Sequence, residues 1–471
     1  INNTLRTDID WDDVDLRTAG TLPNSQSAAL PDYYVGNRFR MIQRFNGRHL
    51  VTFKSVNEWE SLPQTLAVGM AAAAFRQHIS DHAFFTDESA AYAFNISGIT
   101  LSLEGGIKAY FRTMNSHLPD IPAELPGLTE NVVNTDFVTV YAVPKLEYRL
   151  RRVNLTLNLP LSYAHYSFDK AIADRDEGYF SPALDLNWKP DNRFSGTLRG
   201  GIGRSPMNLN LIHPALVLTD YRTLKEGTDR FYNSSSRNIS AAFSYRHTRR
   251  GLFANGMVMQ SWTRVPYTLS QQLYGDYAVY SYADARNDSR MLMATGSVSK
   301  TLDFMRGSCN LNGSFNRNRS HMFSQSQAVD ALSTAWSAGV KVSGTPLRFF
   351  NFDYELRYAA SRLSMNGASQ AWLSSMRNEL KLTFTPHPKW QWIISGEHYR
   401  NQLAENQYKN VLMLDTRLTY RLGKRVELGA DISNILNRSS YNYTVYSQLS
   451  SFESQRSLRG RQLLFSITVK K

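Results

Sequence analysis

The 471-residue chain contains a single cysteine and no long apolar segment. One cysteine, Cys309, excludes a framework of intramolecular disulfides. The nearest approach to an apolar run, residues 66–75, is much shorter than the roughly 20 residues that a membrane-spanning helix needs. A spanning β-strand needs only about 9–11 residues, half of them apolar, so this composition is compatible with a β-structured membrane protein.

The chain also has no concentrated patch of basic residues, although its formal net charge is +13. Arginine and lysine are spread over the expected turns and loops, which argues against a nucleic-acid partner. Acidic lipopolysaccharide and the surrounding outer-membrane lipid are the partners that such a distribution favours. No set of residues has the spacing of a catalytic or cofactor site, so we expect no enzyme activity, cofactor or bound metal.

Short segments in which apolar and polar residues alternate recur from about residue 99 to the C-terminus. Residues 350–358 form one example, and residues 153–163, 379–384 and 426–432 repeat the pattern. A period of two predicts β-strands. An apolar face on nearly every strand, backed by charged residues, favours an outer-membrane β-barrel over a secreted soluble β protein, because lipid covers the outside and water fills the lumen. We therefore expect a lumen-facing set comprising Asp353, Glu355, Arg357, Asp415, Arg417, Glu427 and Asp431. We expect a lipid-facing set comprising Leu155, Leu157, Phe350, Phe352 and Leu428.

Short and long connections alternate between these segments. Tight turns are expected at residues 151–152, 249–250 and 422–424, and long links at residues 205–237, 318–333 and 434–460. Such alternation is typical of outer-membrane barrels with short periplasmic turns and long extracellular loops. The sequence thus predicts an all-β fold: one large antiparallel transmembrane barrel, located in the cell outer membrane as a multi-pass protein.

The number of expected strands bears on whether these residues form a complete barrel. Counting back from the C-terminus gives about 21 strands, hence a barrel of about 20–22 strands in one domain over residues 1–471. Residues 64–77 and 90–95 are counted as separate strands, and the first strand contains residues 5–11. By parity that first strand runs inward, so an outward strand is expected before Ile1. A lumen of this width is usually plugged, and the plug is likewise expected upstream.

Motifs near the C-terminus resemble those of TonB-dependent receptors. Residues 431–437 (DISNILN), followed by Tyr441-Asn442-Tyr443, are similar to the penultimate strand of that family. Residues 459–467 (RGRQLLFSI) look like its final strand, and residues 37–64 are similar to early strands of Bacteroidota members. The chain ends Val469-Lys470-Lys471 rather than on an aromatic residue, which departs from many outer-membrane proteins.

The resemblance implies a receptor that imports a large nutrient, such as a glycan, peptide or metal chelate, by energised uptake through contact with TonB. A second hypothesis is a non-transporting barrel that scaffolds an outer-membrane complex with surface lipoproteins. A third, an open diffusion porin, fits the strand count poorly because general porins are smaller.

Two external loops are rich in tyrosine. Aromatic faces stack on sugar rings and the hydroxyl adds a hydrogen bond, so these loops are candidate ligand sites; interfacial anchoring or packing is the alternative. The candidates are Tyr274, Tyr277, Tyr280, Tyr441, Tyr443 and Tyr446. Two other patterns are weaker. His78 and His82 have the i, i+4 spacing of some metal sites but fit a solvated loop better. The glycine-rich residues 199–204 fit a strand better than a phosphate-binding loop.

Overall fold

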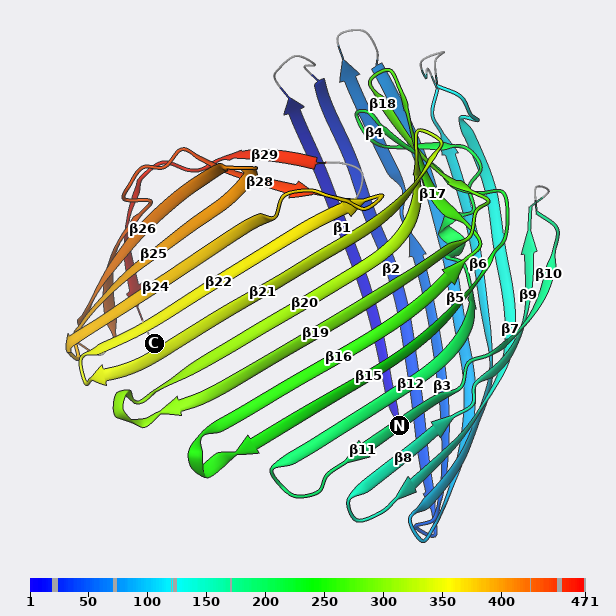
Figure 1. Cartoon of the computed structure of the whole chain (residues 1–471), viewed down its shortest axis with the longest axis horizontal. Coiled ribbons are helices and arrows are strands. Elements are labelled where there is room, and N and C mark those ends of the chain that lie inside the picture. Colours follow the sequence, from blue (N-terminus) through cyan, green and yellow to red (C-terminus); the bar gives the residue numbers. More distant parts are fainter. Residues whose placement is uncertain are drawn as a thin grey trace.

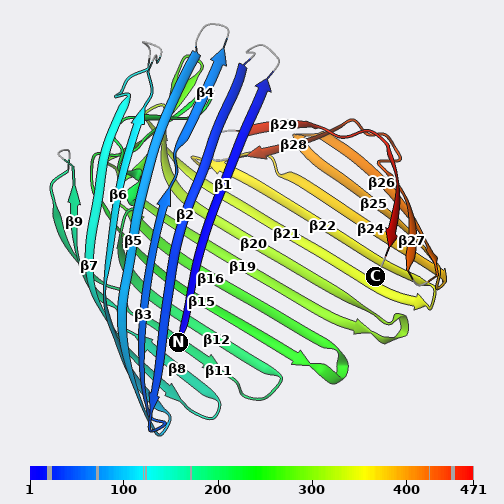
Figure 2. The ribbon, with the colours of Figure 1, turned by 180° about the vertical axis from the view of Figure 1, so that it is seen from behind.

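The computed structural model describes residues 1–18, 24–70, 74–119, 121, 125–169, 172–423, 425–446 and 451–469. They form one strongly curved sheet of 28 strands and a separate two-stranded hairpin (Figures 1 and 2). All pairings within the wall of the sheet are antiparallel. No described helix is long and apolar enough to cross a membrane.

In the described residues the sheet crosses from end to end twenty times. Five of the 28 strands belong to loops, and three passes are each broken into two strands. The unbroken passes are β1 (Asn2–Thr18), β2 (Asn24–Phe45), β5 (Ala74–Ile96), β6 (Ile99–His117), β7 (Glu130–Arg149), β12 (Phe194–Pro206), β15 (Asn233–His247), β16 (Leu252–Val265), β19 (Asn287–Leu302), β20 (Gly307–Ser324), β21 (Gln327–Leu347), β22 (Phe350–Met365), β24 (Leu373–His387), β25 (Trp390–Ala404), β26 (Gln407–Leu422), β27 (Val426–Ser433) and β30 (Gln462–Val469).

A proline interrupts each broken pass. Pro63, Pro160 and Pro182 lie in the breaks, and a proline has no N–H to donate to the neighbouring strand. A neighbouring pass nevertheless pairs with both parts of each broken pass, although the neighbour of the pass broken at Pro182 is itself broken at Pro160. The three broken passes are β3 (His49–Ser61) with β4 (Gln64–Met70), β8 (Val153–Asn158) with β9 (Leu161–Phe168), and β10 (Arg175–Phe180) with β11 (Ala183–Trp188).

The remaining elements lie in the connections. Two short 3-10 helices form turns at one end of the sheet, namely η2 (Thr248–Arg250) and η3 (Asp303–Met305). The long connections at the other end contain η1 (Leu209–Leu211), β13 (Leu216–Asp220), β14 (Thr223–Glu226), β17 (Thr268–Tyr274), β18 (Tyr277–Ala283), β23 (Ala368–Ser369), β28 (Ser440–Tyr446) and β29 (Ser451–Ser457).

The predicted fold class is confirmed in that the protein is all-β and is built from one large antiparallel sheet. One detail of the strand count is wrong. Residues 64–70 continue the β3 pass, and residues 74–96 form one strand of 23 residues that pairs with β6 without a shift in register. The alternation is unclear here because alanine and serine occupy both faces of this strand, so no regular apolar face marks its length.

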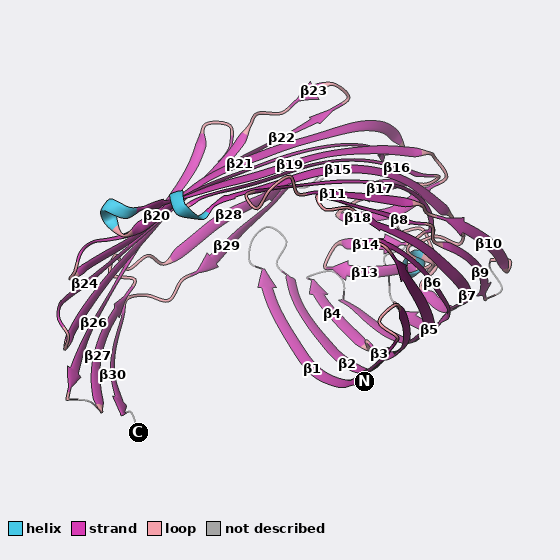
Figure 3. Ribbon diagram, turned by 90° about the horizontal axis from the view of Figure 1, so that it is seen from below, coloured by secondary structure: helices cyan, strands magenta, loops and turns pink. Residues whose placement is uncertain are grey.

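An even number of passes changes the direction of the first strand. β1 runs from the short-turn end towards the long-loop end, opposite to the sequence prediction, and both termini lie at the short-turn end (Figure 1). Parity therefore gives no reason to place a further strand before Ile1. Among the described strands, β1 pairs only with β2 and β30 only with β27, and their edges lie apart (Figure 3). The upstream strand and plug stay predictions.

One predicted long link is also wrong. Residues 318–333 belong to β20 and β21, which continue as a paired ribbon to a two-residue turn. At this turn Gln325 and Ser326 have φ values of 50° and 62°, the left-handed region that two-residue hairpin turns require. The polar composition of the segment reflects strands that extend beyond the apolar part of the sheet.

Candidate functional site

The two faces of the sheet differ in chemistry. We call the concave face, on which the hairpin β13–β14 lies, the inner face, and the opposite one the outer face (Figure 3). Cross-strand register carries exposed apolar residues from strand to strand along the outer face. Ile107, Val140 and Tyr163 form one such row, each more than half exposed. This is the arrangement expected of a surface that meets lipid.

Ion pairs between strands line the inner face. Lys54 of β3 lies 3.0 Å from Glu104 of β6, reaching across β5, and Lys341 of β21 lies 3.3 Å from Glu355 of the adjacent strand β22. Most of these side chains are well exposed, so each pair adds little stability. Arg112 is the exception: it is 4% exposed and binds Asp81 through two nitrogens at 2.8 and 2.7 Å. Together the pairs make a polar surface with closely mixed signs.

The predicted lumen-facing residues all lie on this inner face. Ion pairs join Glu355 to Arg357, Arg417 to Asp431 and Arg421 to Glu427. The carboxylate of Asp415 accepts a hydrogen bond of 2.7 Å from the backbone N–H of Asn434, and Asp353 is directly opposite Lys381 in register.

The predicted lipid-facing residues lie on the outer face. Phe350 stacks on Phe384 with ring centroids 4.9 Å apart, and Leu428 is exposed. Register places Leu155 and Leu157 opposite Tyr148 and Leu146 on the same face. Whether water and lipid cover the two faces as expected stays a prediction.

Folded loops cover part of the long-loop end of the inner face. The hairpins β13–β14 and β17–β18 join through a parallel pairing of β14 with β18, and β17 pairs with the end of β20. Leu216 of β13 and Leu224 of β14 are fully buried against Val68 and Phe75 of the wall. A buried cluster of this kind holds the loops in one conformation.

Two wall side chains bind the loop backbone as another strand would. The amide of Gln77 accepts from the N–H of Leu218 at 2.6 Å and donates to its carbonyl at 2.9 Å. Asn131 makes the same pair of hydrogen bonds to Ala215, at 2.8 and 3.3 Å. Sequence reasoning missed both residues, because their partners lie 141 and 84 positions away along the chain.

Burial shifts the ionisation of several loop groups. It lowers the pKa of His213 below the usual 6.5, while the hydrogen bond to Ala215 acts in the opposite direction. Burial also raises the pKa of the carboxyl of Glu226 and of the phenol of Tyr267. Both loops thus place titratable groups out of water, which favours their neutral forms.

The three candidate tyrosines of the β17–β18 hairpin make contacts inside the loop assembly. Tyr277 is only 9% exposed and meets Phe75 edge-on, with centroids 6.0 Å apart. The hydroxyl of Tyr280 accepts a hydrogen bond of 2.9 Å from Gln271, and the hydroxyl of Tyr274 donates to Gln272. These contacts leave Tyr277 little surface for a ligand. The other three candidates, Tyr441, Tyr443 and Tyr446, lie on strand β28, and their side chains lie outside the described residues.

The histidine pair does not converge. His78 contacts the hydroxyl of Thr65 and His82 contacts that of Ser80, whereas Asp81 points to the other face and binds Arg112. Within the described residues there is no group of three or more His, Cys, Asp or Glu side chains that could hold a metal ion. Residues 199–204 lie within β12, as the sequence predicts.

Comparisons with known proteins identify neighbours in structure only. No family model and no curated protein matches the sequence. Among solved structures, the match with the copper transporter OprC spans 99% of this chain and 80% of the OprC chain, with 9% identity and a TM-score of 0.45. The match with BauA, the ferric preacinetobactin receptor from Acinetobacter baumannii, spans 99% of this chain and 75% of the BauA chain, with 10% identity and a TM-score of 0.47. A mutant of the ferric enterobactin receptor PfeA from Pseudomonas aeruginosa matches over 99% of this chain and 80% of the PfeA chain, with 10% identity and a TM-score of 0.37.

Proposed function

We propose that this chain is the barrel wall of an outer-membrane receptor of the TonB-dependent type, which imports a large nutrient by energised uptake. The observation that carries the proposal is the two-faced sheet, apolar on its outer face and lined by ion pairs on its inner face. The end motifs at residues 431–437 and 459–467 support the same family. Energised uptake would need TonB as a partner, through a segment outside this chain.

The inner face favours a polar cargo. Its charges are mixed and mutually paired, so it presents hydrogen-bonding groups without a strong field of one sign. A glycan or a peptide fits such a lining, and a metal chelate with polar periphery fits it too. The folded loops at the long-loop end would narrow the entrance and contact the cargo first.

The test is uptake by the host bacterium with the gene deleted. We expect uptake of one class of large polar nutrient to fall to background, and uptake by the intact strain to stop when an uncoupler collapses the proton gradient. Restoring the gene provides the control.

Two outcomes would replace the proposal. Uptake that persists with the uncoupler would indicate an open pore. Unchanged uptake, together with loss of lipoproteins from the cell surface, would favour the scaffold that holds surface lipoproteins.

A further inference from the structure

On three strands, β15, β19 and β20, the apolar stretch of the outer face ends in arginine, and β16 lies between β15 and β19. Towards the long-loop end, Ile239 is followed on that face by Arg237 in β15, and Leu292 by Arg290 in β19. In β20 the apolar stretch ends at Phe315 and continues with two arginines. We call Arg237, Arg290, Arg317 and Arg319 the arginine row.

Register brings the arginine row together. Arg237 is directly opposite Trp262 of β16, Trp262 is opposite Arg290, and Arg290 is opposite Arg319. Neighbouring strands lie about 4.8 Å apart, so Arg237 and Arg290 lie about 10 Å apart on either side of the indole. Like charges placed directly opposite each other destabilise a sheet. Nothing in the fold of the wall requires that arrangement.

Only part of this charge is neutralised within the protein. Asp330 pairs with Arg319, and Asp288 pairs with Arg264 at 2.9 Å and Arg286 at 2.6 Å. Within the described residues, no hydrogen bond or ion pair holds the side chains of the other three members of the row. These three are exposed and unpaired: Arg237, Arg290 and Arg317. Arginine stays protonated at any physiological pH, so the positive charge is permanent.

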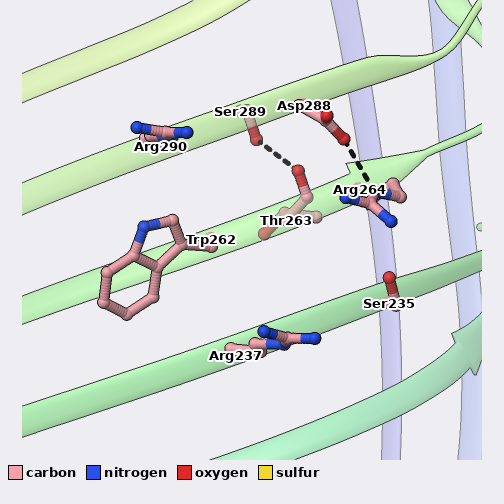
Figure 4. Close-up of a pocket in the computed structure, with 8 residues that line it drawn as sticks. All are labelled: Ser235, Arg237, Trp262, Thr263, Arg264, Asp288, Ser289 and Arg290. Carbon is pink, nitrogen blue, oxygen red and sulfur yellow. Dashed lines mark hydrogen bonds and ion pairs between the residues drawn. The ribbon is translucent and has the colours of Figure 1, made fainter.

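A shallow pocket of about 300 Å³ lies between the strands at this point (Figure 4). Arg237, Trp262 and Arg290 stand one above another across the three ribbons, with Asp288 and Arg264 beside them (Figure 4). Below the pocket the outer face is apolar apart from Gln260, with Val258 half exposed. Tryptophan is enriched where a membrane's apolar core meets its headgroups, which is where a pocket of this composition would sit.

We infer that the arginine row binds the phosphate groups of a phosphorylated glycolipid of the outer leaflet, of the lipid A type. The guanidinium fork matches phosphate oxygens in a bidentate manner, and the row is wide enough for more than one phosphate. The acyl chains then lie on the apolar stretch below, over Ile239, Val258 and Leu292. The inference rests on the outer-membrane location proposed above and is independent of what the protein transports.

The test measures lipid binding by the purified full chain in detergent. The probes are bisphosphorylated lipid A and the same lipid without phosphates. The variant Arg237→Gln/Arg290→Gln should bind the bisphosphorylated lipid about 30-fold more weakly than the unmodified protein, at about five- to sixfold per arginine. All forms should bind the phosphate-free lipid equally weakly.

A matched control removes the same charge elsewhere. Arg151 and Arg152 are exposed and line a second basic pocket at the short-turn end. Arg151→Gln/Arg152→Gln should bind lipid A as the unmodified protein does. If this control loses as much affinity, or if the Arg237→Gln/Arg290→Gln variant loses none, the arginine row is not the site. Displacement of the lipid by an equal concentration of inorganic phosphate would also overturn the inference.

A second variant guards against misfolding. Arg237→Lys/Arg290→Lys keeps both charges but loses the bidentate fork. Its affinity should lie between those of the glutamine variant and the unmodified protein. Affinity equal to that of the glutamine variant, in a form that folds normally by circular dichroism, would contradict a phosphate site.

Discussion

Two of the regions in which the outer face departs from apolar character differ in kind. On β15 to β20 no charged residue interrupts the apolar stretch, in which Gln260 is polar, and the stretch ends in the arginine row. On β3 and β5 the departure lies within the stretch: Glu88 faces outwards beside Ile107, flanked on that face of β5 by Ala90 and Thr86, with the exposed Phe84 and Tyr92 beyond them. Its carboxylate accepts hydrogen bonds from Ser55 at 2.6 Å and from Asn57 at 3.2 Å.

The difference between Glu88 and the arginine row shows that the position of a charge in the membrane determines which groups can pair with it. A charge surrounded by hydrocarbon has no water to bind, so the protein itself must supply its partners, and here a hydroxyl and an amide do so. A charge at the edge of the hydrocarbon can take its partner from the headgroups. The internal pairing of Glu88 and the unpaired state of Arg237 and Arg290 are therefore both expected from their positions.

The largest effect should come from placing arginine within the apolar stretch of β15 to β20. Val258 lies between Ala241 and Ala294, which offer no acceptor. Val258→Arg should reduce the free energy of folding in lipid by about 2–4 kcal/mol. The loss caused by Ile107→Arg should be smaller by up to about 1 kcal/mol, because Glu88 lies directly opposite and can pair with the new arginine. Denaturant titration of the protein folded into vesicles measures both values.

Asn255→Arg supplies the control for this experiment, since Asn255 lies on the inner face of the same strand as Val258. Its effect should be mild. Equal losses for Val258→Arg and Asn255→Arg would show that the two faces are wrongly assigned.

A smaller effect should come from removing one partner of Glu88. Ser55→Ala leaves a carboxylate oxygen with one donor fewer, and should cost about 1–3 kcal/mol of folding free energy. Combining Ser55→Ala with Glu88→Leu removes both polar groups and should recover most of this loss. Denaturant titrations of the two single variants and the double variant measure the coupling. Additive effects would mean that the hydrogen bond contributes nothing.

The salt dependence of lipid A binding should also distinguish the arginine row from Glu88. Salt screens the interactions of exposed charges over a Debye length, which is about 10 Å at 0.1 M salt and shortens as salt rises. Lipid A binding by the unmodified protein should therefore weaken as salt rises, and Arg237→Gln/Arg290→Gln should show a shallower dependence. Glu88→Gln should leave the slope unchanged, because its partners are internal. Binding titrations at several salt concentrations give the slopes, and parallel slopes for all three proteins would contradict the contrast.

The smallest effect should come from mild acid, and it should act on the loops rather than on the arginine row. Burial lowers the folded-state pKa of His213 below 6.5, so the unfolded loop binds more protons. Stability of the β13–β14 hairpin is thus fully present above pH 6.5 and decreases as pH falls below it. Hydrogen exchange of residues 211–228 at pH 7.5 and pH 5, corrected for intrinsic rates, should show faster opening in acid. His213→Gln should remove that difference, and its persistence would exclude His213 as the cause.

The sequence predicted the wall well wherever alternation was clean. Residues 350–358 lie alternately on the two faces of the sheet, as predicted, because polar and apolar residues strictly alternate there. It failed over residues 64–96, where small and polar residues occupy both faces, and over residues 318–333, where polar composition resembled a loop. The arginine row was invisible, because its members lie on three strands and only register brings them side by side.

By itself, the sequence determined the class of fold and the chemistry of each strand face, since a period of two is a local property that needs no knowledge of neighbours. Tertiary structure alone decided the number of passes, the direction of β1, and the contacts made by Gln77, Asn131 and the arginine row. Those depend on which strands pair and in which register, and the free energy that selects a register comes from residues far apart in the chain.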